Sequence, residues 1–165
     1  MKREITTAET STFIKELIEL LKKGNAHVPF NDAIKNIPFE DLGKKPHNLP
    51  YSIWQLTEHI RITQKDILEF SGNKNYKELK WPDDYWPKEA APKNEAEWEK
   101  GINEIHDDLK AFIELLKVED VDLFTPFEHG SGQNLLREAL LIADHTSYHT
   151  GEIIIVRRLL GNWKS

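Results

Sequence analysis

The sequence predicts an all-α protein, and three observations support this fold class. Four segments repeat apolar residues at three- and four-residue steps, which is the period of an amphipathic helix. No stretch alternates apolar and polar residues as a half-buried strand does. The length of 165 residues suits one compact domain that buries its core without disulfides. We therefore expect a single helical domain over residues 1–165.

Apolar periods and capping signals place the helices along the chain. The expected helices cover residues 7–23, 31–36, 53–70, 95–117 and 133–160, of which the second is short. Thr6 and Glu9 form a capping box before the first helix. Ser52 and Gln55 repeat that pattern before the helix at 53–70. The four long segments are the expected helices of a bundle.

Two long connections, at residues 24–50 and 71–92, predict how these helices are joined. A crossover between parallel neighbours requires a long connection, whereas a simple up-down bundle does not. We therefore expect a four-helix bundle with a long crossover between the second and third long helices. The second connection holds Trp81, Tyr85 and Trp86. The favoured interpretation is a lid packed over one end of the core, and the alternative is a role in substrate binding.

Composition restricts the partners and the compartment. The net charge of −6 argues against nucleic acid as a partner, and no apolar run is long enough to span a membrane. The chain has no cysteine, which excludes disulfides, thiolate ligands and a cysteine nucleophile, and which fits a reducing cytoplasm. The amino terminus lacks the apolar region of a secretory signal. We therefore expect a cytoplasmic protein.

Three histidines carry the candidate chemistry. His145 and His149 are four residues apart, so they lie within about 40° of each other on one helix face. His59 has the same core-facing phase in its own helix. Imidazoles on apolar stripes satisfy one another poorly by hydrogen bonding, whereas one shared cation satisfies all three. The sequence therefore predicts that these three residues bind one divalent transition metal.

Two residues near the pair extend this candidate site. Glu152 follows His149 by three residues on the same stripe, where a lone buried carboxylate would be costly. Beside an ion it would be a fourth ligand, a group that orients a ligand, or a general base. Tyr148 lies at the edge of this face, where it can hydrogen-bond an exchangeable ligand. Glu58 points away from His59 and is expected to be solvated.

The remaining histidines are expected to be structural or superficial. His106 shares a stripe with apolar residues, so a partly buried structural histidine is favoured. His27, His47 and His129 fall in polar connections and are expected at the surface, with His129 near the mouth of the site as an alternative.

The last helix also carries a packing signal. Small residues recur every four positions from Ala139 to Gly151, and Gly151 inside a helix implies that another backbone approaches closely. The following segment, 153–156, is apolar on every side and requires cover on every side. Either the helix is central within the monomer or a second subunit covers it, and we favour a symmetric homodimer.

Two motifs resemble those of the DinB-like (damage-inducible) metalloprotein superfamily, which includes thiol S-transferase-type proteins. The segment LLIADHTSYHTGEIIIVRRLLG resembles its last-helix signature, and SIWQLTEHI resembles its second-helix motif. The resemblance implies a four-helix bundle with a crossover, often dimeric, that holds nickel or zinc through His59, His145 and His149. The chain has Thr146 and Glu152 where the family often has Asn or Asp and Gln, respectively.

These observations predict a metal-dependent enzyme that activates a small thiol or water, of the thiol S-transferase or hydrolase type. A site of three histidines leaves coordination positions open, as catalytic metal sites do. Because the chain lacks cysteine, the thiol would be a low-molecular-weight substrate. The alternatives are a non-catalytic metal-binding or stress-response dimer, and a metal-free bundle in which the triad is accidental.

Overall fold

The computed structural model describes residues 6–163, and this part of the chain is helical with no strand. The helices are α1 (Thr7–Lys23), α2 (Phe30–Ala33), α3 (Ile53–Gly72), α4 (Glu95–Leu116) and α5 (Leu135–Leu159), with two 3₁₀ turns at Phe39–Asp41 and Pro46–Asn48. The all-α prediction is confirmed, and each long helix lies within two residues of its expected bounds. No helix in residues 6–163 combines the length and apolarity needed to cross a bilayer.

Local hydrogen bonds explain where the helices begin. The Thr6 hydroxyl accepts from the backbone N–H of Glu9, and Ser52 accepts in the same way from Gln55. The reciprocal bonds are also present, so both predicted capping boxes are confirmed. Asn134 caps α5, which therefore begins two residues later than expected.

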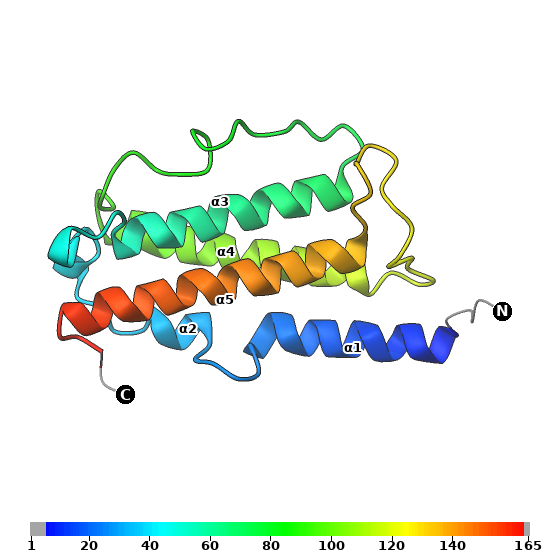
Figure 1. Ribbon diagram of the computed structural model, residues 1–165, viewed down its shortest axis with the longest axis horizontal. Helices are drawn as coiled ribbons and strands as arrows, with labels where there is room; N and C mark the ends of the chain where they lie inside the picture. The colour runs from blue at the N-terminus through cyan, green and yellow to red at the C-terminus, as the bar shows by residue number, and fades with distance from the viewer. Residues whose placement is uncertain (1–5, 164–165) are drawn as a thin grey trace.

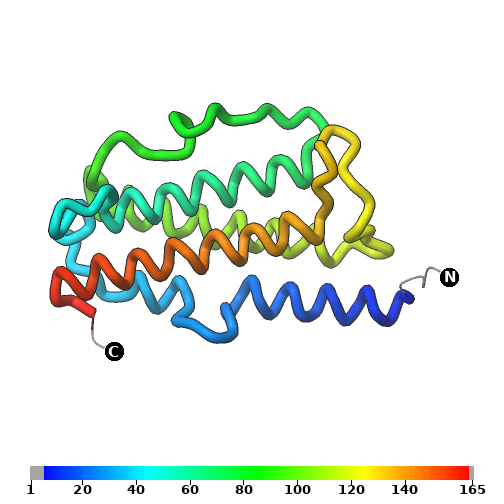
Figure 2. The backbone as a smooth tube through the Cα atoms, viewed as in Figure 1, coloured from blue at the N-terminus to red at the C-terminus, as the bar shows by residue number. Residues whose placement is uncertain are grey.

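Four long helices and the short α2 lie along one axis (Figure 1). Helix α3 packs against both α4 and α5, whereas α1 and α2 follow one another along the other side of α5, where α1 also contacts α4. The chain leaves α3 at one end of the molecule and returns to the other end before α4 begins (Figure 2). As a result, α3 and α4 run in the same direction, and α1 and α5 run against them.

The returning connection, residues 73–94, is held against α3 along its length. The Ser52 hydroxyl donates to the carbonyl of Ala90 at 2.5 Å, and the Gln55 amide donates to that of Pro87 at 3.2 Å. Further along α3, Asp66 accepts a hydrogen bond from a tyrosine of this connection. The connection is therefore not confined to one end of the core, as a lid was expected to be, although its Trp86 packs against a core cluster.

The apolar core consists of two clusters. One includes Leu56 and Ile153, and the other includes Phe112 and Ile142. Along α5, the segment between Ile142 and Ile153 carries the histidine pair, so the pair lies where the two clusters meet. Packed apolar side chains on both sides restrict movement of this part of α5 relative to α3.

The expected close packing at Gly151 is wrong within this chain. Gly151 is exposed, and a Cβ built there meets no heavy atom within 4 Å. Ala139, at the start of the same row, is fully buried. A four-residue row advances by about 40° per step around a helix, so it turns from the core to the surface over three steps. Ile155 is likewise 51% exposed, so the apolar segment is not covered on every side by the described residues.

Gly151→Ala is expected to raise the free energy of unfolding by about 1 kcal/mol, because alanine is the better helix former and nothing blocks its methyl group. Urea unfolding followed by circular dichroism, over a series of protein concentrations, measures the change. A variant less stable than the native protein would mean that another surface packs against Gly151 in solution.

Candidate metal centre

Three histidines from two helices meet between α3 and α5. His59 comes from α3, and His145 and His149 lie on consecutive turns of α5. One ring nitrogen of each lies within 4.8 Å of those of the other two. The Nε2 atoms of His59 and His145 are 3.1 Å apart. The three residues that share a core-facing phase in the sequence therefore share one site.

Hydrogen bonds behind two of the rings fix which nitrogen carries the proton. The His59 Nδ1 atom is 2.8 Å from the carbonyl oxygen of Tyr85, which can only accept. The His149 Nδ1 atom is 2.6 Å from a carboxylate oxygen of Glu152. Both rings therefore keep the proton on Nδ1, which leaves Nε2 with a free lone pair. This is the tautomer that a metal ligand requires.

Burial keeps the rings of His59 and His145 uncharged. His59 is 3% exposed and His149 is 7% exposed. Burial, reinforced by the neighbouring His149 and His59, lowers the pKa of His145 to about 3. Burial also lowers the pKa of His59, against the opposing effect of its hydrogen bond to Tyr85. At neutral pH these two imidazoles therefore offer lone pairs rather than positive charges.

An aromatic stack closes one side of His59. The Trp86 ring lies parallel to His59, with centroids 3.8 Å apart and an interplanar angle of 8°. Tyr51 stacks on the opposite face of Trp86, also at 3.8 Å. The stack restricts rotation of the His59 ring and excludes water from one of its faces. The ring is thus held both by its edge and by its face.

The Tyr85 carbonyl is itself held in place through Asp66. The hydroxyl of Tyr85 donates to one carboxylate oxygen of Asp66 at 2.6 Å, and the hydroxyl of Tyr76 donates to the other at 2.7 Å. Burial and the Asp66 carboxylate raise the pKa of Tyr76 to about 12 and that of Tyr85 further, so both hydroxyls stay protonated. Asp66 and His59 are two turns apart on α3. A single helix face therefore binds Tyr85 by its side chain and by its backbone.

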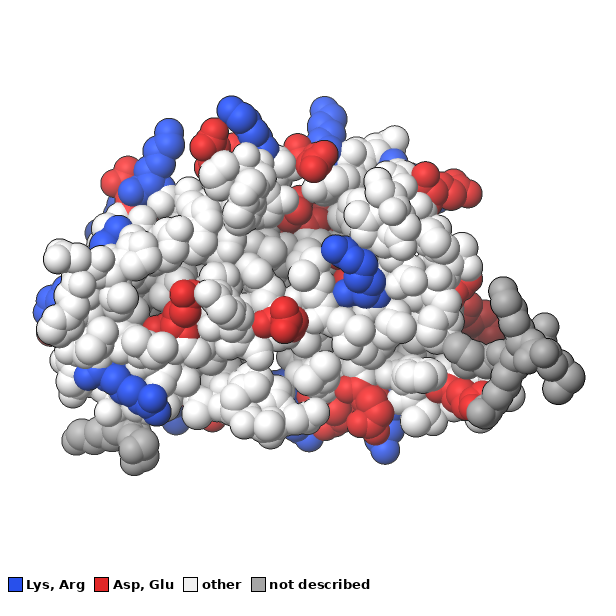
Figure 3. Space-filling model, in the orientation of Figure 1, with Lys and Arg blue, Asp and Glu red and all other residues white. Residues whose placement is uncertain are grey.

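A cavity of about 400 Å³ opens beside the triad. It is bounded by α3, by α5 and by the connection at 73–94, and its walls contain all three histidines together with Thr63. The Thr63 hydroxyl is buried and has no hydrogen-bond partner among the described residues. In Figure 3 most of this face is uncharged, and Lys and Arg side chains interleaved with Asp and Glu stand along its upper edge, over the connection. A small molecule can therefore reach the histidines from this face.

The donor set fits a divalent transition ion. Imidazole nitrogens bind zinc and nickel at about 2.0–2.1 Å, so two ligand atoms of one ion lie at most about 4.2 Å apart. The 3.1 Å separation between His59 and His145 is within this limit. Ligand atoms of a tetrahedral ion lie about 3.4 Å apart, so the limit of 4.8 Å for the whole group corresponds to a closing movement of up to about 1.4 Å. Side-chain rotation of His149 alone can supply such a movement.

Glu152 contacts a candidate ligand, as one of its three expected roles requires, whereas Glu58 is not solvated as expected. The Glu152 carboxylate lies 2.6 Å from the Nδ1 atom of His149. Its side chain is 35% exposed. Glu58 was expected in solvent, but it is 8% exposed and forms a two-pronged ion pair with Arg61 at 2.9 and 2.8 Å. The reason is that α4 packs over this turn of α3 at Gly101.

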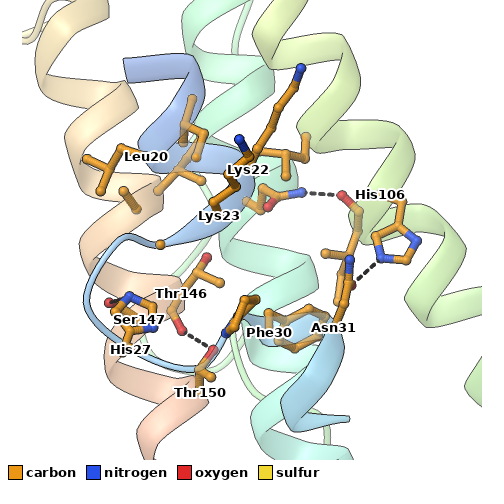
Figure 4. Close-up of a pocket in the computed structure, with 18 residues that line it drawn as sticks. Leu20, Lys22, Lys23, His27, Phe30, Asn31, His106, Thr146, Ser147 and Thr150 are labelled. Atoms are coloured by element: carbon orange, nitrogen blue, oxygen red, sulfur yellow. Dashed lines mark hydrogen bonds between the residues drawn. The ribbon is translucent and has the colours of Figure 1, made fainter. Parts of the chain in front are cut away.

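The other histidines lie outside the triad. His106 was expected to be partly buried, but it is exposed and bonds the Asn31 side chain at 2.7 Å. It borders a smaller cavity of about 80 Å³ against the opposite face of α5 (Figure 4). His27 borders the same cavity and contacts Ser147 at 3.0 Å. His129 contacts the carbonyl of Phe70, and it is not among the residues that line the triad cavity. His106 is exposed because its stripe reaches the edge of α4 beside the short α2.

Sequence reasoning missed Asp66, and it named Tyr85 and Trp86 only as parts of a lid or a substrate-binding loop, without their contacts to His59. Tyr85 acts through its backbone, which carries no sequence signal. Asp66 lies seven residues after His59, so its helical phase placed it on the same face. That helical phase, together with two tyrosines in the following connection, was the sequence signal that could have predicted the contacts of Asp66.

Comparison with known proteins identifies one family. The sequence model of the DinB superfamily matches residues 29–153, which is well over half of the chain and includes all three histidines. This match confirms the family resemblance seen in the two motifs. Neither the curated proteins nor the solved structures contain a match to the chain.

The metal-free protein is expected to lose stability as the pH falls below about 6.5. The ordinary imidazole pKa of 6.5 applies to the unfolded chain, whereas folded His145 has a pKa of about 3. Between these values the unfolded chain binds more protons, so the free energy of unfolding falls by up to roughly 1.4 kcal/mol per pH unit for this one group. The contribution of His145 to the free energy of unfolding is fully retained at pH values well above 6.5. Urea unfolding in a chelator from pH 7.5 to 4 measures the slope.

His145→Leu should flatten this slope, and His106→Gln, at an exposed histidine, should not. Equal slopes for the native protein and His145→Leu would contradict the assignment of the acid sensitivity to this ring.

Tyr85→Phe is expected to weaken metal binding, whereas Tyr76→Phe is its matched control. Both remove one hydroxyl from the same carboxylate, but only Tyr85 also contacts His59. Loss of a group that orients a metal-bound histidine indirectly is expected to cost up to about tenfold in affinity. Competition with a chromogenic chelator measures affinity, and the visible spectrum of the cobalt(II) form reports the ligand geometry. Equal effects of the two substitutions would mean that Tyr85 only stabilises the fold.

Proposed function

This chain belongs to the DinB superfamily, and we propose that it is a metal-dependent enzyme that activates a small thiol or water at His59, His145 and His149. The ion is zinc or nickel, because neutral imidazoles suit both. The reaction is of the thiol S-transferase or hydrolase type. If it is thiol transfer, the thiol is a small molecule, because the chain has no cysteine.

One observation carries the proposal: the three rings present their inner nitrogens to a common point while two outer nitrogens are already hydrogen-bonded. The Nδ1 atoms of His59 and His149 are already bonded, which leaves their Nε2 lone pairs for a shared partner, and one ring nitrogen of each histidine lies within 4.8 Å of those of the others. His145 has one N–H and can donate to only one of them. A cation satisfies all three nitrogens together, and a hydrogen-bonded cluster does not.

The charges of the site favour activation of a nucleophile. When bound, a divalent ion held by neutral ligands lowers the pKa of a thiol or water beside it toward neutrality. Tyr85 and Glu152 keep the rings of His59 and His149 in the binding tautomer. The Trp86 ring excludes water from one face of His59. The contact of Glu152 with His149 Nδ1 supports its role in orienting that ring, and we also propose this carboxylate, 35% exposed, as the general base.

The scaffold we propose is one domain, a four-helix bundle in which residues 73–94 form the crossover. Figure 1 supports this topology, since the connection returns along α3 and leaves α3 and α4 parallel. Bundles place metal sites on facing helices near the middle of their length. The α3 and α5 positions of the triad follow that pattern.

A dimeric metal-binding module is the second candidate function. Its support is the outer face of α5, where Leu140, Tyr148, Ile155 and Leu159 are 45–64% exposed. Such an apolar stripe favours a symmetric homodimer built on α5. The concentration series described for Gly151→Ala also measures this association. If the protein is an enzyme, the dimer would stabilise the helix that carries the metal site. If it is a non-catalytic module, formation of the dimer would itself be the function.

The proposal predicts about one zinc or nickel per chain in protein purified without a histidine tag or added metal. His149→Ala should lose the metal and any turnover together, because the site then keeps only two ligands. Elemental analysis measures metal content, and turnover is screened with small thiols paired with electrophiles and with hydrolysable esters and amides. His106→Gln, outside the triad, should retain both metal and turnover.

Two substitutions of Glu152 separate its roles. Glu152→Gln keeps an acceptor for the His149 N–H, so metal should remain bound, and turnover should fall by roughly 10²–10⁴-fold if the carboxylate is a general base. Glu152→Ala removes the acceptor and should weaken metal binding by roughly 10–100-fold. The proposed function would be contradicted if the purified protein contained no metal and also failed to bind zinc or nickel when either ion was added.

A further inference from the structure

Aromatic rings form much of the cavity beside the triad. Trp81, Tyr85 and Trp86 line it from the connection at 73–94, and Tyr148 lines it from α5. The outermost two are unusually open to solvent, with Trp81 67% and Tyr148 64% exposed. Each of these two exposed rings contacts another ring of the cavity wall. Trp81 lies 5.4 Å from Tyr85, and Tyr148 lies 4.9 Å from His149.

These rings leave apolar surface uncovered at the entrance. An exposed indole and an exposed phenol gain free energy when a flat apolar group covers them. Binding sites for small molecules are typically apolar with a few polar groups that fix orientation. Here the unpartnered hydroxyl of Thr63, which lies in the same cavity wall, supplies one such polar group.

The charge on the cavity wall restricts the ligand further. Asp144 is the one formally charged residue among those described as lining the cavity, and none of them is Lys or Arg. No hydrogen bond or ion pair engages Asp144 within the described part of the chain. A carboxylate on the ligand body would therefore meet a like charge and no Lys or Arg side chain, whereas an ammonium group would meet an unpaired carboxylate near aromatic rings.

We infer that the triad cavity binds a ring-bearing compound whose body is uncharged or carries one positive charge, and that it discriminates against anionic bodies. Trp81 and Tyr148 cover the ring, and Asp144 sets the charge preference. The inference rests on the proposed function only for the thiol end of the ligand, which is expected at the histidines. The preference for the ring and against the anion depends on the cavity wall alone.

Matched benzyl mercaptans test the inference in the cobalt(II)-loaded full-length protein. Benzyl mercaptan, its 4-aminomethyl derivative and its 4-carboxy derivative share the thiol and the ring, and their substituents at the far end are hydrogen, a cationic aminomethyl group and an anionic carboxylate. The first two should bind at least about tenfold more tightly than the carboxylate, because like charges are excluded. The sulfur-to-cobalt charge-transfer absorption in the near ultraviolet measures each titration.

A second arm needs no metal. Benzyl alcohol, benzylammonium and benzoate are titrated into chelator-treated protein and followed by saturation-transfer NMR. The first two should bind in preference to benzoate. If cobalt does not bind but this order holds, the inference stands and the proposed function fails.

Substitutions assign the preference to residues. Trp81→Ala and Tyr148→Ala should each weaken benzyl mercaptan by roughly threefold to tenfold, the usual range for one aromatic contact. Asp144→Asn should weaken the aminomethyl compound by roughly twofold to fivefold and leave benzyl mercaptan unchanged. Phe39→Ala and Asp107→Asn are the matched controls, since Phe39 is also an exposed aromatic ring and both residues are outside the cavity lining.

Two results would overturn the inference. One is equal binding of the carboxylate and neutral compounds in both arms. The other is an unchanged ligand affinity in Trp81→Ala and Tyr148→Ala, as in Phe39→Ala. If those two variants instead lose self-association, the rings belong to a contact between two copies of the chain.

Discussion

The need to hydrogen-bond the buried polar groups of α3 organises this protein. Every residue from Ser52 to Ile60 is buried, and several of them are polar. A polar group buried without a partner costs roughly 1–3 kcal/mol. Ser52, Gln55 and His59 find their partners in backbone carbonyls of the connection at 73–94. That requirement keeps the connection on α3 over most of the helix, where a loop with no such bonds would be free to leave it.

The same bonds determine the chemistry of the triad. A carbonyl behind His59 and a carboxylate behind His149 select the tautomer that leaves Nε2 free. Burial keeps His59 and His145 uncharged, so the rings attract a cation instead of repelling one. Because the connection also contributes Trp86 and Trp81, one segment orients a histidine and forms the wall of the cavity. Fold, site and entrance therefore depend on one set of contacts.

Membership of the DinB superfamily agrees with the fold, but the reaction has to be argued from the site. One scaffold can hold different reactions when the groups around the cavity change. In this chain those groups are aromatic rings, a single unpaired carboxylate at Asp144 and an unpartnered hydroxyl at Thr63. In the function that we propose, these groups select the small molecule that approaches, and the three histidines determine its reaction.

The sequence by itself determined the helices and the shared phase of the three histidines, because helical hydrogen bonds and side-chain angles depend on residues a few positions apart. Both capping boxes and the long-helix bounds followed from the same local rules. Only the tertiary structure decided that Tyr85 binds His59, that Glu58 is buried and that Gly151 faces outward. Each of these depends on how helices and connections that are distant in sequence pack together, and helical periodicity carries no information about that packing.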